Sequence, residues 1–201
     1  MYLAKLTLDR SRRAYYWSLQ PYRVHQRLCL ACPDDPRLLW RLEDDTRQPH
    51  LLVQSHQEPD WGRAFDEFAV LAEPPQQKTV TWALSPGDVL AFRLRANPSM
   101  KKTFEDGKKR IGLYDEDDQW EWLTRKAEQA GFRVLRAEAR QEGMVRGTHT
   151  GRRGIRMLSV RWDGLLGVLD AARLREALVS GVGSGKAMGF GLLSLAPGSP
   201  G

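Results

Sequence analysis

Two side chains that can exchange protons, Tyr22 and His25, stand three residues apart in this sequence. An imidazole has a pKa close to neutrality and can take up or release a proton, and a phenol nearby can orient a hydroxyl group. Pro21 favours the first turn of a helix, and residues three apart on a helix project from the same face. The segment predicts a helix carrying a candidate acid–base pair; a histidine packed in the core is the structural alternative.

A second unusual segment, Gly181–Gly191, holds five glycines and Lys186. Glycine allows close approach of another backbone or a phosphate, and free N–H groups with a lysine offer donors to an anion. The P-loop pattern fails, because Ser180 and Ala187 stand where it needs Gly and Ser or Thr, and the dinucleotide pattern lacks its third glycine. A nucleotide cofactor is therefore not expected; a structural glycine turn is the alternative.

His25, Cys29 and Cys32 have the spacing H-x₃-C-x₂-C, which raises the question of a zinc site. Zinc usually takes four ligands, and Asp34 or Asp35 would have to complete the set. We therefore predict no metal, no cofactor and two half-buried thiols. Two cysteines are also too few for a disulfide framework, which fits a reducing compartment.

The composition fits a protein that acts on a polyanion in the cytoplasm. The chain has 201 residues and 41% hydrophobic content, with no apolar run of the roughly 18 residues of a membrane span. Residues 1–86 hold 11 basic and 11 acidic side chains, so the net charge of +6 lies in residues 87–201. Residues 133–161 contain eight arginines and only two acidic residues, both glutamates. Such an excess is typical of a nucleic-acid binder.

The pattern of apolar residues predicts an α+β protein made of two similar halves. In the first half, we expect strands at 1–8, 37–43, 51–55 and 78–84 and helices at 21–31 and 61–71. This βαββαβ order is that of a ferredoxin-like domain. After a boundary at Ser85–Asp88, the order repeats, with strands at 89–96, 132–137, 155–162 and 190–195 and helices at 117–130 and 171–179. An extra hairpin is expected at 108–114.

These elements define the predicted domains and place the motifs on them. Residues 1–86 form the N-terminal domain with the candidate catalytic helix, 87–196 form the C-terminal domain, and 197–201 form a disordered tail. Trp120 is expected to face the core. The basic connection 146–154 between two strands contains His149, which is the next candidate for catalysis, and has the composition of a hairpin that enters a nucleic-acid groove.

Several segments together resemble a known family over nearly the whole length. They are Met1–Leu8, Pro21–His25, Leu39–Leu42, Glu58–Trp61, Phe92–Pro98, Gly107–Arg110 and Gly181–Ala196. The chain is similar to the CasE family, the CRISPR repeat-processing endoribonuclease of type I-E Cascade complexes. The resemblance implies two ferredoxin-like domains of the RAMP superfamily type. It also implies metal-independent cleavage of precursor CRISPR RNA at the base of the repeat stem-loop, with 2′,3′-cyclic phosphate and 5′-hydroxyl products, and retention on the product beside other Cascade subunits.

The resemblance also implies roles for individual residues. His25 would exchange a proton with the attacking 2′-hydroxyl or the leaving 5′-oxygen, and Tyr22 would position the 2′-hydroxyl. Relatives carry a lysine at the position that matches Leu30, for which Arg27 is the nearest substitute and Arg23 the second, although helix geometry does not put Arg27 on the Tyr22 and His25 face. From charge and location, the residues expected to hold RNA are Arg93, Arg95, Arg146, Arg152, Arg153, Arg156, Gly183, Gly185 and Lys186.

Two other classes of function fit parts of the pattern. The main rival is a non-catalytic RNA-binding subunit of the same superfamily, with a packed His25, which would bind repeat RNA without cutting it. A DNA-binding regulator would bind duplex DNA as well as hairpin RNA, but the sequence has no recognisable helix-turn-helix.

Overall fold

The computed structural model describes residues 1–35, 37–44, 46–105, 107–147 and 154–198. The contacts divide the chain into two units. Unit 1 comprises residues 1–82, 146–155 and 186–189, and unit 2 comprises residues 83–145, 156–185 and 190–201. The predicted C-terminal domain thus contributes two short segments to unit 1, and one of them belongs to the glycine-rich segment.

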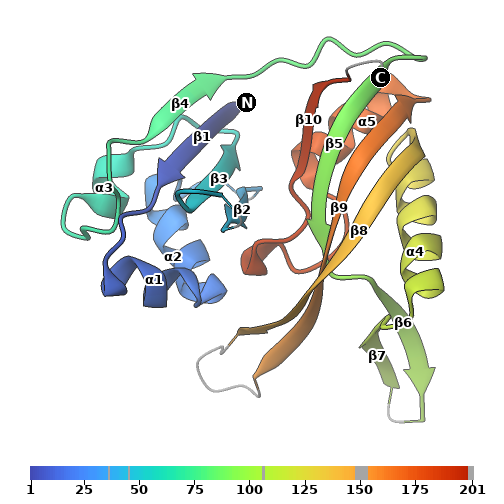
Figure 1. The fold of residues 1–201 in the computed structure, drawn as a ribbon, viewed down its shortest axis with the longest axis horizontal. Coiled ribbons are helices and arrows are strands. Elements are labelled where there is room, and N and C mark those ends of the chain that lie inside the picture. The colour runs from blue at the N-terminus through green and yellow to red at the C-terminus, as the bar shows by residue number, and fades with distance from the viewer. Residues whose placement is uncertain (36, 45, 106, 148–153, 199–201) are drawn as a thin grey trace. The chain divides into compact units, whose positions relative to one another are not determined.

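Unit 1 is a four-stranded antiparallel sheet with helices (Figure 1). The strand order is β2-β3-β1-β4, and β1 pairs with β3 from Tyr2 opposite Ser55 to Thr7 opposite His50. Its main elements are β1 (Tyr2–Thr7), α1 (Arg12–Ser18), α2 (Pro21–Ala31), β2 (Leu39–Glu43), β3 (His50–Ser55), α3 (Trp61–Phe65) and β4 (Gln76–Thr79). This order is that of a ferredoxin-like sheet.

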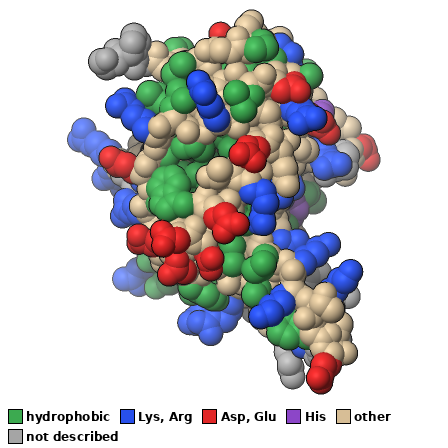
Figure 2. All heavy atoms as spheres, turned by 90° about the vertical axis from the view of Figure 1, so that its right-hand side faces the viewer, with side chains coloured by type: hydrophobic (Ala, Val, Ile, Leu, Met, Phe, Trp, Pro, Cys, Tyr) green, Lys and Arg blue, Asp and Glu red, His purple; other side chains and the backbone are tan. Residues whose placement is uncertain are grey.

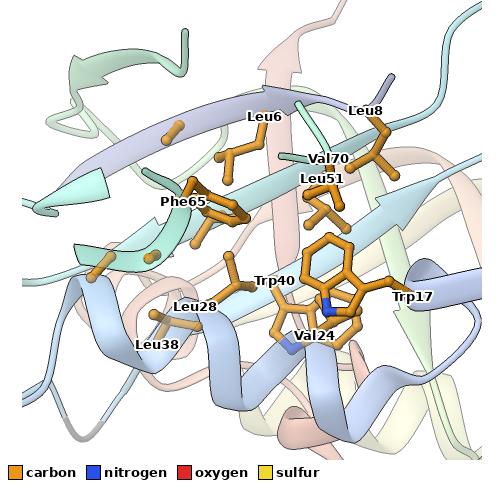
Figure 3. Close-up of a cluster of buried hydrophobic side chains, with 14 of the residues drawn as sticks. Leu6, Leu8, Trp17, Val24, Leu28, Leu38, Trp40, Leu51, Phe65 and Val70 are labelled. Carbon is orange, nitrogen blue, oxygen red and sulfur yellow. The ribbon is translucent and has the colours of Figure 1, made fainter. Parts of the chain in front are cut away.

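The core of unit 1 lies between this sheet and α2 (Figure 3). Period-two alternation along β1 buries Leu6, and the strand β3 contributes Leu51. Helical spacing brings Val24 and Leu28 of α2 against them, and both side chains are fully buried. The apolar face of α2 is therefore fixed in the core, which determines the direction of its other faces.

Unit 2 is built on the same plan. Its sheet has the order β10-β5-β9-β8, and a separate two-stranded sheet is formed by β6 and β7. The elements are β5 (Val89–Ala96), β6 (Ser99–Phe104), β7 (Gly107–Gly112), α4 (Glu116–Gln129), β8 (Phe132–Gly147), β9 (Ile155–Val168), α5 (Ala171–Ser180) and β10 (Leu193–Pro197). A 3₁₀ helix, η1 (Lys186–Met188), precedes β10 along the chain.

Two stacked tryptophans mark the core of unit 2. The rings of Trp122 and Trp162 lie 5.8 Å apart with an angle of 18° between their planes. The prediction that Trp120 faces the core is wrong: it is half-buried, and Trp122 is buried in its place. Asp115 caps α4, two residues before the helix start expected at 117.

Most expected elements are present, with several different bounds. The helix α1 was not expected, because its apolar residues are few and its exposed face carries two tyrosines. The helix expected at 61–71 is only α3, and β4 covers 76–79 instead of 78–84. The strands β8 and β9 are longer than predicted, since polar residues continue the pairing beyond the core. The strand β10 runs to Pro197, which pairs with Leu90, and residues 199–201 of the predicted tail lie outside the described residues.

Candidate active site and nucleic-acid interface

The helix α2 presents Tyr22, His25 and Cys29 on one face. Pro21 stands in its first turn, and the buried residues Val24 and Leu28 hold the adjacent face of the helix against the sheet. Tyr22, His25 and Cys29 follow one another at intervals of three and four residues, and all three side chains are half-buried. The structure thus brings the two predicted catalytic residues to one face, at the edge between the core and the solvent.

His25 is held in a neutral environment. Burial lowers its pKa from the ordinary value of 6.5, so at pH 7 the imidazole is uncharged and can accept a proton. The Sγ atom of Cys29 lies 3.7 Å from Nε2 and 3.9 Å from Nδ1 of the same ring. Burial and the charge of Asp35 raise the pKa of Cys29, so it remains a thiol that can donate to one of the ring nitrogens.

The two predicted supporting cations, Arg23 and Arg27, face another way. They lie with Leu30 in a pocket between α1 and α2, a pocket that Tyr22 and His25 do not line. The guanidinium of Arg27 is held there, because it donates to the carbonyl of Ala64 at 3.3 Å. The geometry therefore does not support either arginine as the replacement for a lysine at Leu30.

The glycine-rich segment contributes to the surroundings of α2. Its 3₁₀ helix η1 packs against α2 and β2 within unit 1, and Met188 is buried there. A Cβ atom on Gly189, whose φ is +80°, would lie 3.1 Å from the ring of Trp40. Lys186, the first residue of η1, is therefore carried by an element that touches the candidate catalytic helix.

Gly183 and Gly185 have a structural requirement of their own. Both have positive φ, +83° and +85°. An added Cβ would lie 3.0 Å from the ring of Trp122 at Gly183 and 2.9 Å from the sulfur of Met157 at Gly185. Internal packing alone thus accounts for both glycines, and their approach to RNA stays a prediction.

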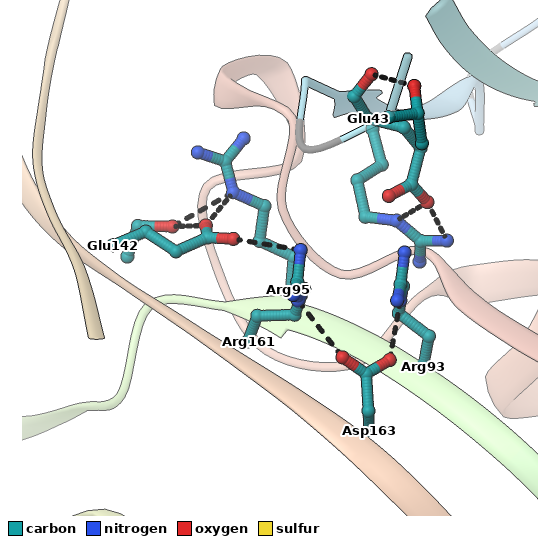
Figure 4. Close-up of polar contacts among 9 residues, drawn as sticks. Glu43, Arg93, Arg95, Glu142, Arg161 and Asp163 are labelled. Atoms are coloured by element: carbon teal, nitrogen blue, oxygen red, sulfur yellow. Dashed lines mark hydrogen bonds and ion pairs between the residues drawn. The ribbon is translucent and has the colours of Figure 1, made fainter. Parts of the chain in front are cut away.

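Arg93 and Arg95 belong to an ion-pair network on the sheet of unit 2 (Figure 4). Arg95 pairs with Glu142 at 2.6 Å and donates to Ser159 at 2.9 Å, and its side chain is 15% exposed. Arg93 pairs with Asp163, which also pairs with Arg161 at 3.0 Å. These carboxylates offset the charges that the sequence pattern assigned to phosphate binding.

One cluster of exposed positive charge in unit 2 lies on the β6–β7 hairpin. Five basic side chains are exposed there: Lys101, Lys102, Lys108, Lys109 and Arg110. The ring of Phe104, 40% exposed, lies 5.8 Å from the ammonium groups of Lys102 and Lys109. Figure 2 shows Lys and Arg side chains in the lower part of this face and also higher up, with a group of acidic side chains at mid-height and another acidic one at the lowest tip. Sequence reasoning noted Gly107–Arg110 only as part of the family resemblance; the lysines on both strands were the available signal of a basic hairpin.

The predicted basic connection is described only at its two ends. Arg146 and Arg156 are both exposed, near the end of β8 and the start of β9. Arg152, Arg153 and His149 lie outside the described residues. Arg146 and Arg156 are thus available to a polyanion.

The described residues contain no group of three metal-ligating side chains. Cys32 is buried, and burial raises its pKa to about 11, so its thiol stays protonated. Neither is any helix of the described chain long and apolar enough to cross a membrane.

Comparison with known proteins identifies the family. A family model described as "CRISPR associated protein" matches residues 1–197. The chain is 39% identical to the CRISPR-associated endoribonuclease Cse3 of Thermus thermophilus, over 98% of this chain and 100% of that protein. The chain belongs to the family of Cse3 and CasE. The CRISPR system Cascade subunit CasE of Escherichia coli is 33% identical over 98% of this chain and 100% of its own length.

Solved structures of the Cse3 and CasE family agree with this fold. Cse3 bound to a 19-nucleotide RNA superposes with a TM-score of 0.84 at 37% identity, covering 98% of this chain and 100% of that one. Cas6e of E. coli gives 0.75 at 32% identity, again over 98% and 100%. The prediction of a tandem ferredoxin-like α+β protein of this family is confirmed.

Proposed function

We propose that this protein is a metal-independent endoribonuclease that cuts precursor CRISPR RNA at the base of the repeat stem-loop. The observation that supports this most is that His25, which is uncharged at pH 7, lies on the same face of α2 as Tyr22, at the edge between the core and the solvent. The family adds support, since a relative of 39% identity is named an endoribonuclease and one structure of Cse3 holds RNA representing a pre-cleavage complex.

The proposed reaction is an in-line transfer within the RNA. The 2′-oxygen forms a bond to the adjacent phosphorus while the bond from phosphorus to the 5′-oxygen breaks. The 2′-hydroxyl loses one proton and the 5′-oxygen gains one, so the products are a 2′,3′-cyclic phosphate and a 5′-hydroxyl. The neutral ring of His25 accepts or returns this proton, and the phenol of Tyr22 orients the 2′-hydroxyl. The need for that hydroxyl restricts the reaction to RNA.

The positive charge that stabilises the phosphorane must come from a residue at another position, because Leu30 stands where relatives carry a lysine. Lys186 is the candidate, because η1 places its backbone against α2. A positive charge near the developing anion lowers the barrier without a metal ion. The β6–β7 hairpin, Arg146 and Arg156 supply contacts to the phosphates of the RNA stem. The protein would act in the cytoplasm, remain on its product and join the other Cascade subunits, as CasE does by name.

Incubation of a repeat stem-loop RNA with the protein in EDTA tests the proposal. We expect a single cut at the base of the stem, a 2′,3′-cyclic phosphate on the upstream product and a 5′-hydroxyl on the downstream one. A stem-loop with a 2′-deoxy nucleotide at the cut is the control and stays intact. Tight binding of the unmodified RNA without any cut would refute the enzyme and favour the non-catalytic RNA-binding subunit.

A further inference from the structure

A pocket of about 580 Å³ lies between α1 and α2, on the side of α2 that carries neither Tyr22 nor His25. All of its lining residues belong to unit 1. They are Arg13, Tyr16, Trp17, Gln20, Arg23, Gln26, Arg27, Leu30 and Phe68. The volume falls within the usual range of small-ligand sites, about 300 to 1,000 Å³.

The pocket gathers positive charge without an opposing carboxylate. Three arginines line it and no acidic residue does. Among the described residues, none of the three forms an ion pair, and the only hydrogen bond of Arg27 goes to the neutral carbonyl of Ala64. Guanidinium groups held together in this way repel one another, and an anion placed between them would relieve that repulsion.

The arginines are also arranged for stacking. The guanidinium carbons of Arg13 and Arg27 each lie 4.4 Å from the centroid of the Phe68 ring. Such contacts keep guanidinium planes in a fixed orientation beside an aromatic ring. Tyr16 is 61% exposed at the pocket and offers a further ring. Stacking surfaces beside cations are what proteins use to bind unpaired bases and their phosphates.

Two amide side chains complete the chemistry. Gln20 and Gln26 line the pocket, and an amide carries both donors and acceptors, as the edge of a base does. An acidic peptide would pair with the arginines but would leave the ring of Tyr16 and these amides without a matching group. The combination therefore favours a nucleotide over a carboxylate-rich peptide.

We propose that this pocket binds a nucleotide of the single-stranded RNA that flanks the repeat stem. The identity of the RNA rests on the proposed function. Arg23 and Gln26 directly follow Tyr22 and His25 in the same helix, about 1.5 Å further along its axis and about 100° around it, so a strand that crosses α2 from the cut passes onto the face of the pocket. The pocket would thus hold the RNA beside the stem and leave the proton transfer to the other face.

The test compares RNAs with and without a flank, by fluorescence anisotropy at one fixed salt concentration. The probes are the stem-loop alone, the stem-loop with a 5′ single-stranded flank and the stem-loop with a 3′ flank, each with a 2′-deoxy nucleotide at the cut. Arg13→Gln is the main variant, because Arg13 stands on α1, outside the candidate catalytic face. Arg37→Gln is the matched control, since it removes the same charge from an exposed position of unit 1 away from the pocket.

We expect Arg13→Gln to weaken binding of one flanked RNA roughly tenfold, as expected for losing one charge-assisted phosphate contact. Binding of the bare stem-loop should stay unchanged, as should cleavage of an all-ribose stem-loop that carries one nucleotide beyond the cut and all properties of Arg37→Gln. The proposal for the pocket would be overturned by an equal loss of affinity for bare and flanked RNA, or by no loss of affinity for either flanked RNA. It would also be overturned if polyglutamate competed more strongly than a single-stranded oligoribonucleotide of equal charge. Because the probes are uncleavable, a protein that binds the flank but never cuts would overturn only the enzymatic proposal.

Discussion

The thiol of Cys29 lies one helical turn after His25, with its sulfur 3.7 Å from Nε2 of the imidazole ring. At this distance the sulfur lies beside the half-buried ring. Burial lowers the pKa of the imidazole and raises the pKa of the thiol, so both groups are uncharged at pH 7. The candidate base therefore has a neutral neighbour on its own helix.

Replacement of His25 by Ala should abolish cleavage and leave RNA affinity within a few fold. The imidazole supplies the proton transfer, which typically contributes 10²- to 10⁴-fold to a rate, whereas the phosphate contacts lie elsewhere. Single-turnover cleavage and equilibrium binding measure the two effects. His56→Ala, at an exposed position, is the control and should cut normally. Normal cutting by the His25 variant would move the chemistry to another residue, with His149 as the next candidate.

The pH dependence of cleavage should follow the protonation of the His25 imidazole. The pKa of His25 is lowered, so kcat/KM should rise with pH with a midpoint below 6.5 and be level near neutrality. The same shift affects folding: the contribution of His25 to stability is complete above pH 6.5 and is lost as the pH falls through the folded pKa, because the unfolded chain takes up the proton first. Cleavage rates and urea unfolding between pH 4.5 and 7.5, roughly the range of histidine titration, measure both.

Cys29→Ala should move that midpoint up toward 6.5, since it opens the ring to water. Cys29→Ser keeps a donor of similar size and should move it less. A midpoint that is the same in all three proteins would show that the thiol has no part in setting the state of His25.

Lys186→Met should slow cleavage by about 10²-fold, the magnitude typical for loss of one group that stabilises transition-state charge. Methionine keeps the length of the side chain and removes only its charge. Lys78→Met, at an exposed position of β4, is the control. A rate equal to that of the unaltered protein, at saturating RNA, would assign the phosphorane charge to another cation.

The β6–β7 hairpin should contribute to affinity and to its salt dependence. Lys102→Gln combined with Lys108→Gln should weaken RNA binding and reduce the slope of log K against log salt by about 1 to 2, as for one or two lost phosphate contacts. A double variant of Lys5 and Lys78, both exposed in unit 1, matches the change in charge. Equal slopes in the two double variants would place the RNA away from the hairpin.

The network around Glu142 should matter for stability. Glu142→Gln removes the carboxylate between Arg95 and Arg161 and should lower the free energy of unfolding by about 1 to 3 kcal/mol. Glu138→Gln, which is exposed on the same strand, should change it by less than about 0.5 kcal/mol. Urea unfolding followed by tryptophan fluorescence measures both values.

The sequence predicted those elements whose signals are local. Pro21 was expected to stand in the first turn of a helix at 21–31, and α2 has these bounds; the helix expected at 171–179 is α5, which is one residue longer. The ends of β8 and β9 depend on pairing between distant residues, which no local pattern carries. Likewise, charge and location marked Arg93 and Arg95 as candidates to hold RNA, but their neutralising partners, Asp163 and Glu142, stand 70 and 47 residues away in sequence.

The candidate site shows the same division between local and distant information. Helical spacing alone brought Tyr22 and His25 together. It also indicated that Arg27 faces elsewhere, and the pocket confirms that direction. The contact of η1 with α2 required the fold, because these segments are separated by most of the chain.

Met188 touches more than the helix. A Cβ atom on Gly147, at the end of β8, would come within 2.5 Å of its terminal carbon, so the strand that leads into the arginine-rich connection presses on η1, which in turn presses on α2. The last residue of β8, the 3₁₀ helix η1 and the helix of His25 thus form one continuous series of packed elements, in which Gly147 has no room for a side chain.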